Sequence, residues 1–369
     1  MKNNFRHQTY SDDRPSARFE LLEAEFPSQP GSAAFAEIAK RFDQSIHGHV
    51  DSVFLVHGSF VGDDSLGWTA QISKRFPNVG SQITMLGKRL VDLVSGESGN
   101  FTDDFRKLLE DSLTQQQKNI AVRKFVWSSE NTHSGRARAA IELLHELIET
   151  GKQKFLFLCH SHGGNVLALV TNLLGAEPQK RNKFLSIVRS LFHGADKAIY
   201  EKVSRYLATD AAKEIALHIV TMGTPVRYGW EQSGYHNLLH VVNHRRHEDV
   251  AEYLAPPLNL NGLKSIKGDV IQQAGIASTN FFPFLLDKQL METERNLGAM
   301  IQAGIERKTV LDRLRLGTRV HDAGTTLLVD YDNYEGLARL MAGHAIYTRP
   351  EWLAFHLDQI RERMFPKTD

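Results

Sequence analysis

Residues Phe155 to Leu169 read Phe-Leu-Phe-Leu-Cys-His-Ser-His-Gly-Gly-Asn-Val-Leu-Ala-Leu, an apolar run interrupted by one small, glycine-rich turn. The part before the turn has the composition of a buried strand, and the part after it has that of a buried helix. A serine at such a strand-to-helix corner stands on a strained turn, where its hydroxyl projects from the backbone and the following N–H groups face the same space. We therefore predict that Ser161 is a nucleophile directed at a carbonyl carbon.

The usual form of this turn, the nucleophile elbow, has a glycine two residues before the serine and another two residues after it. Here Gly163 and Gly164 follow Ser161, while Cys159 takes the place of the first glycine. Cysteine is small, but it brings a Cβ atom into a crowded turn. The alternative interpretation is an ordinary glycine turn, with serine present only for its size. We expect Cys159 to fill the core rather than to act as a second nucleophile.

Further strands and helices alternate on both sides of this turn. Apolar strands are predicted at 52–57, 121–127, 215–222, 238–242 and 325–330. A helix is predicted from Ser134 to a C-terminal Gly151, and a final helix from about Pro350 to Met364. Because strands that alternate with helices form mainly parallel sheets covered on both faces, the predicted fold class is α/β.

The expected domain organisation is one α/β core with additions. Residues 1–32 are polar and contain helix breakers, so we expect an arm that precedes the domain. The core is expected over 33–254, with a helical insertion at about 179–213, and it resumes over 317–369. Between these parts, 255–316 is predicted to form a helical cap or lid. The alternative is that both helical segments are ordinary helices that complete the core.

The composition of the chain indicates which kinds of binding partner and which location to expect. The 369 residues include 44 Lys and Arg against 43 Asp and Glu, a net charge of +1 that gives no basic surface typical of nucleic-acid binding. A single cysteine excludes an internal disulfide. The first residues lack an apolar signal segment, and no stretch approaches the length of a transmembrane helix. We expect a small-molecule or lipid partner, transient contact with a membrane surface, and a cytoplasmic location, with export by a signal-independent route left open.

The whole pattern resembles the α/β-hydrolase superfamily, and more closely its lipase and esterase members. The resemblance covers roughly residues 50–250 and 325–365. It rests on the Ser161 elbow and on four weaker features: the turn His57-Gly58, the pair Trp127-Ser128, the downstream Asn131 and Arg136, and the turn Gly223-Thr224-Pro225. It implies a mainly parallel central sheet with helices on both faces and a helical cap or lid insertion.

The same resemblance implies a catalytic triad. The family arranges its triad in the order serine, acid, histidine, with the acid after a late strand and the histidine before the last helix. Asp249, which follows the strand at 238–242, takes the place of the acid, and His344 takes the place of the base. His344 has the alternative role of a residue that only packs near the last helix. The acids that remain open as alternatives to Asp249 are Glu248, Asp330 and Asp332.

An oxyanion hole is implied as well. Its donors are the backbone N–H of His162 and one from Ser59 or Phe60 in the first loop. His57 is expected to support that loop rather than to act as a base. The run from His244 to His247 has the composition of a metal or anion site, but a solvated loop face is the simpler interpretation. No metal and no cofactor are expected.

Together these expectations describe a serine hydrolase that cleaves carboxylic esters through an acyl-enzyme, which water activated by His344 then hydrolyses. Lipid esters are favoured because the two apolar helical segments are suited to cover an acyl pocket and to part at an interface. Three alternatives remain open: a phospholipase-type antibacterial effector toxin, a thioesterase or amidase that uses the same triad, and a binding module of this fold without turnover. The sequence does not select the acyl chain length, the head group or the oligomeric state.

Overall fold

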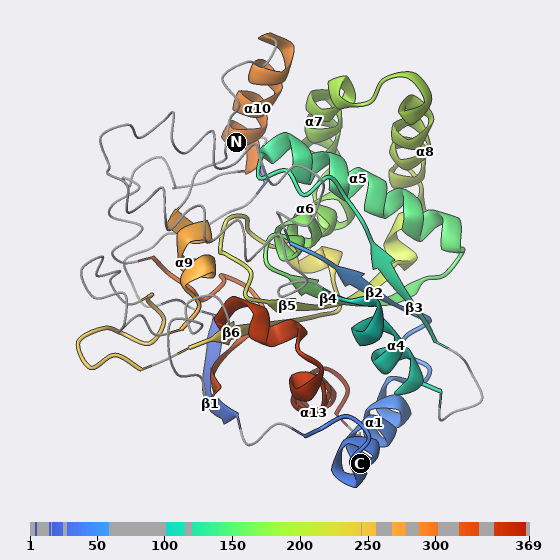
Figure 1. The fold of residues 1–369 in the computed structure, drawn as a ribbon. Coiled ribbons are helices and arrows are strands. Elements are labelled where there is room, and N and C mark those ends of the chain that lie inside the picture. Colours follow the sequence, from blue (N-terminus) through green and yellow to red (C-terminus); the bar gives the residue numbers. More distant parts are fainter. Residues whose placement is uncertain are drawn as a thin grey trace.

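The computed structural model contains a seven-stranded sheet in which every strand runs parallel to its neighbours (Figure 1). The structure describes residues 4–5, 15, 17–24, 28–58, 101–114, 120–244, 246–255, 268–277, 288–301, 317–331 and 343–366. The strand order is β1-β7-β6-β5-β4-β2-β3. The strands are β1 (Arg18–Ala24), β2 (Ser52–Val56), β3 (Ala121–Phe125), β4 (Lys154–His160), β5 (Ala216–Met222), β6 (Asn237–Asn243) and β7 (Thr325–Tyr331).

The described helices connect these strands or flank them. The α-helices are α1 (Ala33–Ile46), α4 (Asp103–Asp111), α5 (His133–Thr150), α6 (Gly163–Gly175), α7 (Pro178–Val188), α8 (Lys197–Leu207), α9 (Val270–Ala277), α10 (Lys288–Ile301) and α13 (Leu353–Met364). Short 3-10 helices are η1 (Arg189–Leu191), η2 (Gly194–Asp196), η3 (Asp210–Glu214), η4 (Gln232–Gly234), η7 (Ile346–Thr348) and η8 (Pro350–Trp352). The α/β class and the parallel sheet predicted from the sequence are confirmed.

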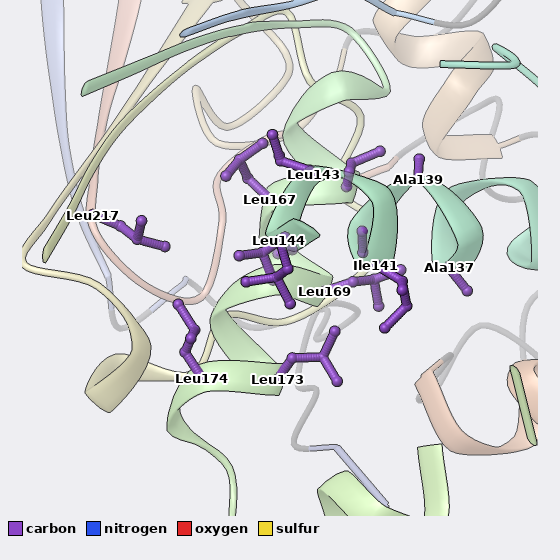
Figure 2. Packing of buried hydrophobic residues seen from close by; sticks show 14 of the residues in the cluster. Ala137, Ala139, Ile141, Leu143, Leu144, Leu167, Leu169, Leu173, Leu174 and Leu217 are labelled. Atoms are coloured by element: carbon purple, nitrogen blue, oxygen red, sulfur yellow. The ribbon is translucent and has the colours of Figure 1, made fainter. Parts of the chain in front are cut away.

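Each face of the sheet has its own hydrophobic core because side chains alternate along a strand. On β4, Phe155 and Phe157 pack with α5, α6, α7 and α8, whereas Leu156 and Leu158 pack with α1, α4 and α13. Figure 1 shows these two groups of helices on opposite sides of the sheet. Leucines of α5 and α6 belong to the same core as Leu217 of β5 (Figure 2). Each fully buried leucine contributes about 2 kcal/mol to the free energy of unfolding. Central strands buried on both faces therefore read as continuous apolar runs.

The order of the strands reverses once, around β2. The chain passes from β2 outward to β3 at the sheet edge and then returns to β4 on the other side of β2. Ligands of open α/β sheets bind in the crevice that such a reversal creates beyond the carboxyl ends of the strands. The residues that follow Val56 and His160 are therefore expected to line a ligand site.

One of the segments outside the expected core differs from the prediction made from the sequence. Part of the expected arm over 1–32 forms β1, which pairs along its whole length with β7 at the sheet edge. Its side chains are half-exposed, as expected of an edge strand that carries charge. The segment at 179–213 does contain helices, α7 and α8. Of 255–316, the described helices are α9 and α10, and α10 contacts α5 and α7. Among the described helices, none is both long and apolar enough to cross a membrane.

Candidate active site

The backbone at Ser161 is left-handed, with φ of +52°, a conformation that costs free energy for any residue other than glycine. Ser161 follows the last residue of β4 and precedes α6 by two positions. Its N–H donates to the carbonyl of Met222 (2.8 Å), and its carbonyl accepts from Thr224 Oγ1 (2.7 Å). The end of the neighbouring strand β5 therefore holds the strained turn in place. This is the backbone geometry that the elbow motif predicts.

The two glycines after the turn are required by close approaches. A Cβ atom on Gly163 would lie 2.6 Å from the carbonyl oxygen of Val56, and one on Gly164 would lie 2.2 Å from Thr224 Oγ1. Real side chains do not tolerate such distances, so α6 reaches this position only with glycine at both places. Cys159 points into the core instead, and burial raises the pKa of its thiol well above the usual value. A buried, protonated thiol is not a nucleophile.

The turn after β2 lies directly against Ser161. A Cβ atom on Gly58 would stand 2.5 Å from Ser161 Cβ and 3.1 Å from Ser161 Oγ. On the other side of the serine, His162 is the N-cap residue of α6. Its backbone N–H has no acceptor among the described residues. A helix N-terminus favours negative charge nearby. Of the expected oxyanion donors, His162 is thus suitably placed, while Ser59 and Phe60 lie outside the described residues.

His344 is hydrogen-bonded to a buried carboxylate, and the partner is Asp269. The distance from His344 Nδ1 to Asp269 Oδ2 is 2.7 Å, and the Asp269 side chain is fully buried. The other carboxylate oxygen, Oδ1, accepts from the backbone N–H of Gln272 (2.8 Å) in the first turn of α9. A carboxylate that accepts from Nδ1 fixes the neutral tautomer in which Nε2 is free to take a proton. His344 Nε2 makes no hydrogen bond with any described residue.

His344 contacts His160, the residue that precedes Ser161. His160 Nε2 donates to the carbonyl of His344 (2.9 Å), and the two imidazole rings stack at a tilt with centroids 4.4 Å apart. On the other side of the serine, burial lowers the pKa of His162 well below its usual value, and the charges of Arg136, Arg227 and His344 lower it further. The His344–Asp269 pair therefore lies near the two residues that flank Ser161 in the chain, one at the end of β4 and the other before the start of α6.

The expected acid, Asp249, does not pair with His344. Asp249 is exposed, in a loop where its N–H meets His247 Nδ1 at 3.4 Å. Glu248 is exposed beside it, Asp330 is partly buried at the end of β7, and Asp332 lies outside the described residues. The two carboxylates differ in burial: Asp249 is exposed in its loop, whereas the Asp269 side chain is fully buried against His344. The residue that meets His344 follows Gly268, within the segment expected to be a cap.

His57 supports the loop after β2, as the sequence suggested. Its Nδ1 donates to the carbonyl of Gly58 (2.8 Å), and its Nε2 accepts from the N–H of Trp127 (3.3 Å). The Trp127 indole N–H in turn donates to the carbonyl of His57 (3.0 Å). Burial lowers the pKa of His57, so the ring is neutral and both nitrogens are occupied. His57 thus fastens the turn beside Ser161 to the end of β3 and is not available as a base.

Arg136, one of the residues that carry the resemblance, is fully buried near the elbow. Its Nε donates to Tyr228 Oη (2.7 Å), and its Nη1 donates to Asn131 Oδ1 (2.8 Å). Arg227, also buried, lies close enough for its charge to act on His162. Burial is the main reason that the pKa of His162 is lowered, and these two cations lower it further. Positive charge close to His162 favours an anion bound nearby.

The N-terminus of α5 is capped by a carboxylate from α10. Glu294 Oε1 accepts from the backbone N–H of His133 (2.6 Å), and Oε2 accepts from that of Ser134 (2.8 Å). Glu294 is buried, so it satisfies two N–H groups that the helix itself leaves unpaired. Part of the segment at 255–316 is therefore bound to the core close to Arg136.

The His244 loop has a pairing of its own. His244 Nε2 lies 2.5 Å from Glu252 Oε2, and its Nδ1 lies 3.0 Å from Nη1 of the buried Arg319. Among the described residues, no group of three or more His, Cys, Asp or Glu side chains is arranged to hold a metal ion. The run from His244 to His247 is thus neither wholly solvated nor a metal cluster: its first histidine is buried, and His247 is exposed.

Comparison of the chain with protein-family models, with curated proteins and with solved structures gave no match. The site must therefore be interpreted from its own geometry.

Proposed function

We propose that this chain is a serine hydrolase of the α/β-hydrolase type that cleaves carboxylic esters, with Ser161 as nucleophile, His344 as general base and Asp269 as the acid that orients it. The observation that carries the proposal is the left-handed Ser161 at the end of β4, preceded by His160, whose ring contacts a histidine with its Nδ1 bonded to a buried carboxylate. A left-handed serine lowers the stability of the fold, and such strained residues are found mostly at functional sites.

In the proposed reaction, Ser161 Oγ attacks the ester carbonyl carbon while its proton passes to His344 Nε2. The negative charge on the carbonyl oxygen is stabilised by the N–H of His162 and by the loop after Gly58. Collapse of this intermediate expels the alcohol, which takes the proton from His344, and leaves an acyl group on Ser161. A water molecule deprotonated by His344 then attacks the acyl-enzyme, and the acid is released with the serine restored.

Lipid esters are the proposed substrate class. Support comes from the segment that carries Asp269, because α9 begins at the next residue and packs close to His162, the residue after Ser161. A Cβ atom on Gly275 of α9 would lie 2.9 Å from Pro225 and 3.7 Å from His162 Nε2. The acid of the triad and a covering helix are thus consecutive in the chain. We propose that α9 and α10 form a cap over the acyl site.

A fluorophosphonate probe tests the nucleophile directly, because it reacts with serines activated by a base. The purified protein, with Ser161→Ala and His344→Ala beside it, is labelled and the adduct is located by peptide mapping. Labelling at Ser161 in the wild type, and its loss in both variants, is the expected result. A folded wild-type sample that stays unlabelled with and without detergent would overturn the proposal in favour of a binding module.

The substrate class needs a separate measurement. Hydrolysis of one ester series is followed below and above the concentration at which the substrate forms micelles. A lipid hydrolase with a cap over its site shows a rise in rate when the interface forms. Equal rates per molecule in both regimes, with short acyl chains preferred, would contradict the lipid assignment and leave a general esterase.

A further inference from the structure

The Tyr347 phenol connects the acid of the triad to the end of β6. Its hydroxyl donates to Asp269 Oδ2 (2.9 Å), the same oxygen that accepts from His344 Nδ1. The hydroxyl also accepts from the backbone N–H of Asn243 (2.7 Å), which leaves its own proton directed at the carboxylate. Burial raises the pKa of Tyr347 well above its usual value, and the charge of Asp269 adds to this, so the phenol keeps its proton.

Asn243 holds all three parts of this arrangement together. Its N–H meets Tyr347 Oη, its carbonyl accepts from the N–H of Asp269 (3.3 Å), and its Nδ2 donates to the carbonyl of Gly343 (2.9 Å). Gly343 precedes His344, so one residue at the end of β6 fixes the positions of the acid, the base and the phenol. The two loops also touch, since a Cβ atom on Gly343 would lie 2.9 Å from the carbonyl of Gly268.

We infer that Tyr347 is a positioning residue of the proposed hydrolase, one that acts on His344 through the carboxylate of Asp269. The catalytic consequence of this inference rests on the proposed function. Its geometry rests on the hydrogen bonds of Tyr347 Oη with Asp269 and Asn243 and on the bond between His344 and Asp269. A phenol that donates to Oδ2 takes part of the carboxylate charge and holds that oxygen in line with His344 Nδ1. It thereby limits how strongly Asp269 stabilises the protonated imidazole, which is the form that cannot accept the serine proton.

Several other groups face this pair and remain in place when the phenol oxygen is removed. His160 of β4 and His162 at the start of α6 lie beside His344. Buried Arg319 is near enough to Asp269 and Tyr347 for their charges to act on its pKa, and the Tyr331 ring contacts that of Tyr347. All of these groups remain in Tyr347→Phe, so a change in the pH dependence of that variant reports the loss of the phenol hydroxyl.

Tyr347→Phe removes only the hydroxyl. Tyr331→Phe is the matched control, because Tyr331 is equally buried and its hydroxyl bonds His356 Nε2 (2.8 Å), away from the triad. The pH dependence of kcat/KM on a soluble ester is measured for both. We expect Tyr347→Phe to lower kcat about tenfold with KM nearly unchanged, and to move the midpoint of the acid limb up by about 0.5 pH unit. Tyr331→Phe should leave the acid limb where it is.

A purely structural role would lower the activity of both variants without moving the acid limb, and that result would overturn the inference. A titration of His344 followed by NMR tests the same shift without turnover. If Ser161 fails to react with the fluorophosphonate probe but the midpoint for His344 still moves in Tyr347→Phe alone, the proposed function is wrong and the coupling through Asp269 stands. If Ser161 reacts and the midpoint is unmoved, the coupling is wrong and the proposed function stands.

Discussion

Two buried histidines of this chain are each bonded to a carboxylate, and they differ in what occupies the second ring nitrogen. His344 uses Nδ1 for Asp269 and leaves Nε2 without a partner among the described residues. His244 uses Nε2 for Glu252, and its Nδ1 accepts from Arg319, which can only donate. Burial lowers the pKa of His244 to about 4, with Arg319 as a second cause. His244 therefore has no nitrogen left to accept a proton.

The difference shows that a buried histidine–carboxylate pair is not by itself a catalytic unit. In the pair of the proposed triad, the carboxylate orients a ring whose other nitrogen has no partner among the described residues, and that ring contacts the residue before Ser161. In the other pair the same chemistry holds a loop against the end of the sheet. The second ring nitrogen and its surroundings decide between the two roles.

The largest expected effect separates the two acids that the sequence and the structure select. Asp269→Asn removes the charge that orients His344, so turnover is expected to fall about 10⁴-fold with folding preserved. Asp249→Asn is the matched change in the exposed loop, and we expect turnover within about threefold of wild type because Asp249 has no contact with His344. Steady-state kinetics on both, with circular dichroism as the folding control, makes the comparison. The reverse ranking would return the acid to Asp249.

The next effect is the pH dependence of stability that His244 contributes. Its pKa is about 4 in the folded chain against 6.5 when unfolded, so the unfolded chain binds the proton more readily. The free energy of unfolding from this group is fully present above pH 6.5 and is lost as pH falls toward 4, by about 3 kcal/mol. Urea unfolding of His244→Gln across this range should show a correspondingly shallower decline than wild type. His247→Gln, in the same loop but exposed, should decline as wild type does.

The smallest expected effect concerns the carboxylate of the second pair. Glu252→Gln keeps an acceptor for His244 but removes the charge that Arg246 and Arg319 face, and should cost about 1 kcal/mol of stability. Catalytic rate should stay within about twofold of wild type, because Glu252 does not touch the proposed triad. A loss of activity as large as that of Asp269→Asn, measured on a sample of normal stability, would show that both pairs take part in the reaction.

Much of the fold follows from local patterns in the sequence. The strands around the elbow are buried on both faces, so they read as unbroken apolar runs, and β2, β4 and β5 begin or end within one residue of the expected positions. Gly151 closes α5 in a left-handed conformation, as a C-terminal glycine does. The sequence did not predict β1 because it is an edge strand. Its side chains are half-exposed, so its sequence lacks the apolar run that marks a buried strand.

Of the proposed triad, Ser161 and His344 could be selected from the sequence, and Asp269 could not. Ser161 is marked by glycines that close approaches require, and His344 is marked by its place before the last helix. Asp269 comes from a long connection after β6, and which loop folds back onto His344 depends on contacts distant in sequence. One local signal was present: Gly268-Asp269 precedes an apolar helical stretch, as a helix-capping aspartate does.

The pairing of β1 with β7 sets an order for assembly on the ribosome. Arg18 pairs with Thr325, so partners in this ladder are made about 300 residues apart. Chains are synthesised from the N-terminus, so β1 cannot pair until β7 has been made. β7 also precedes His344 in the chain. A nascent chain that has reached Ser161 thus lacks both the partner strand of β1 and the proposed base, and the proposed hydrolase becomes competent only after His344 has been synthesised.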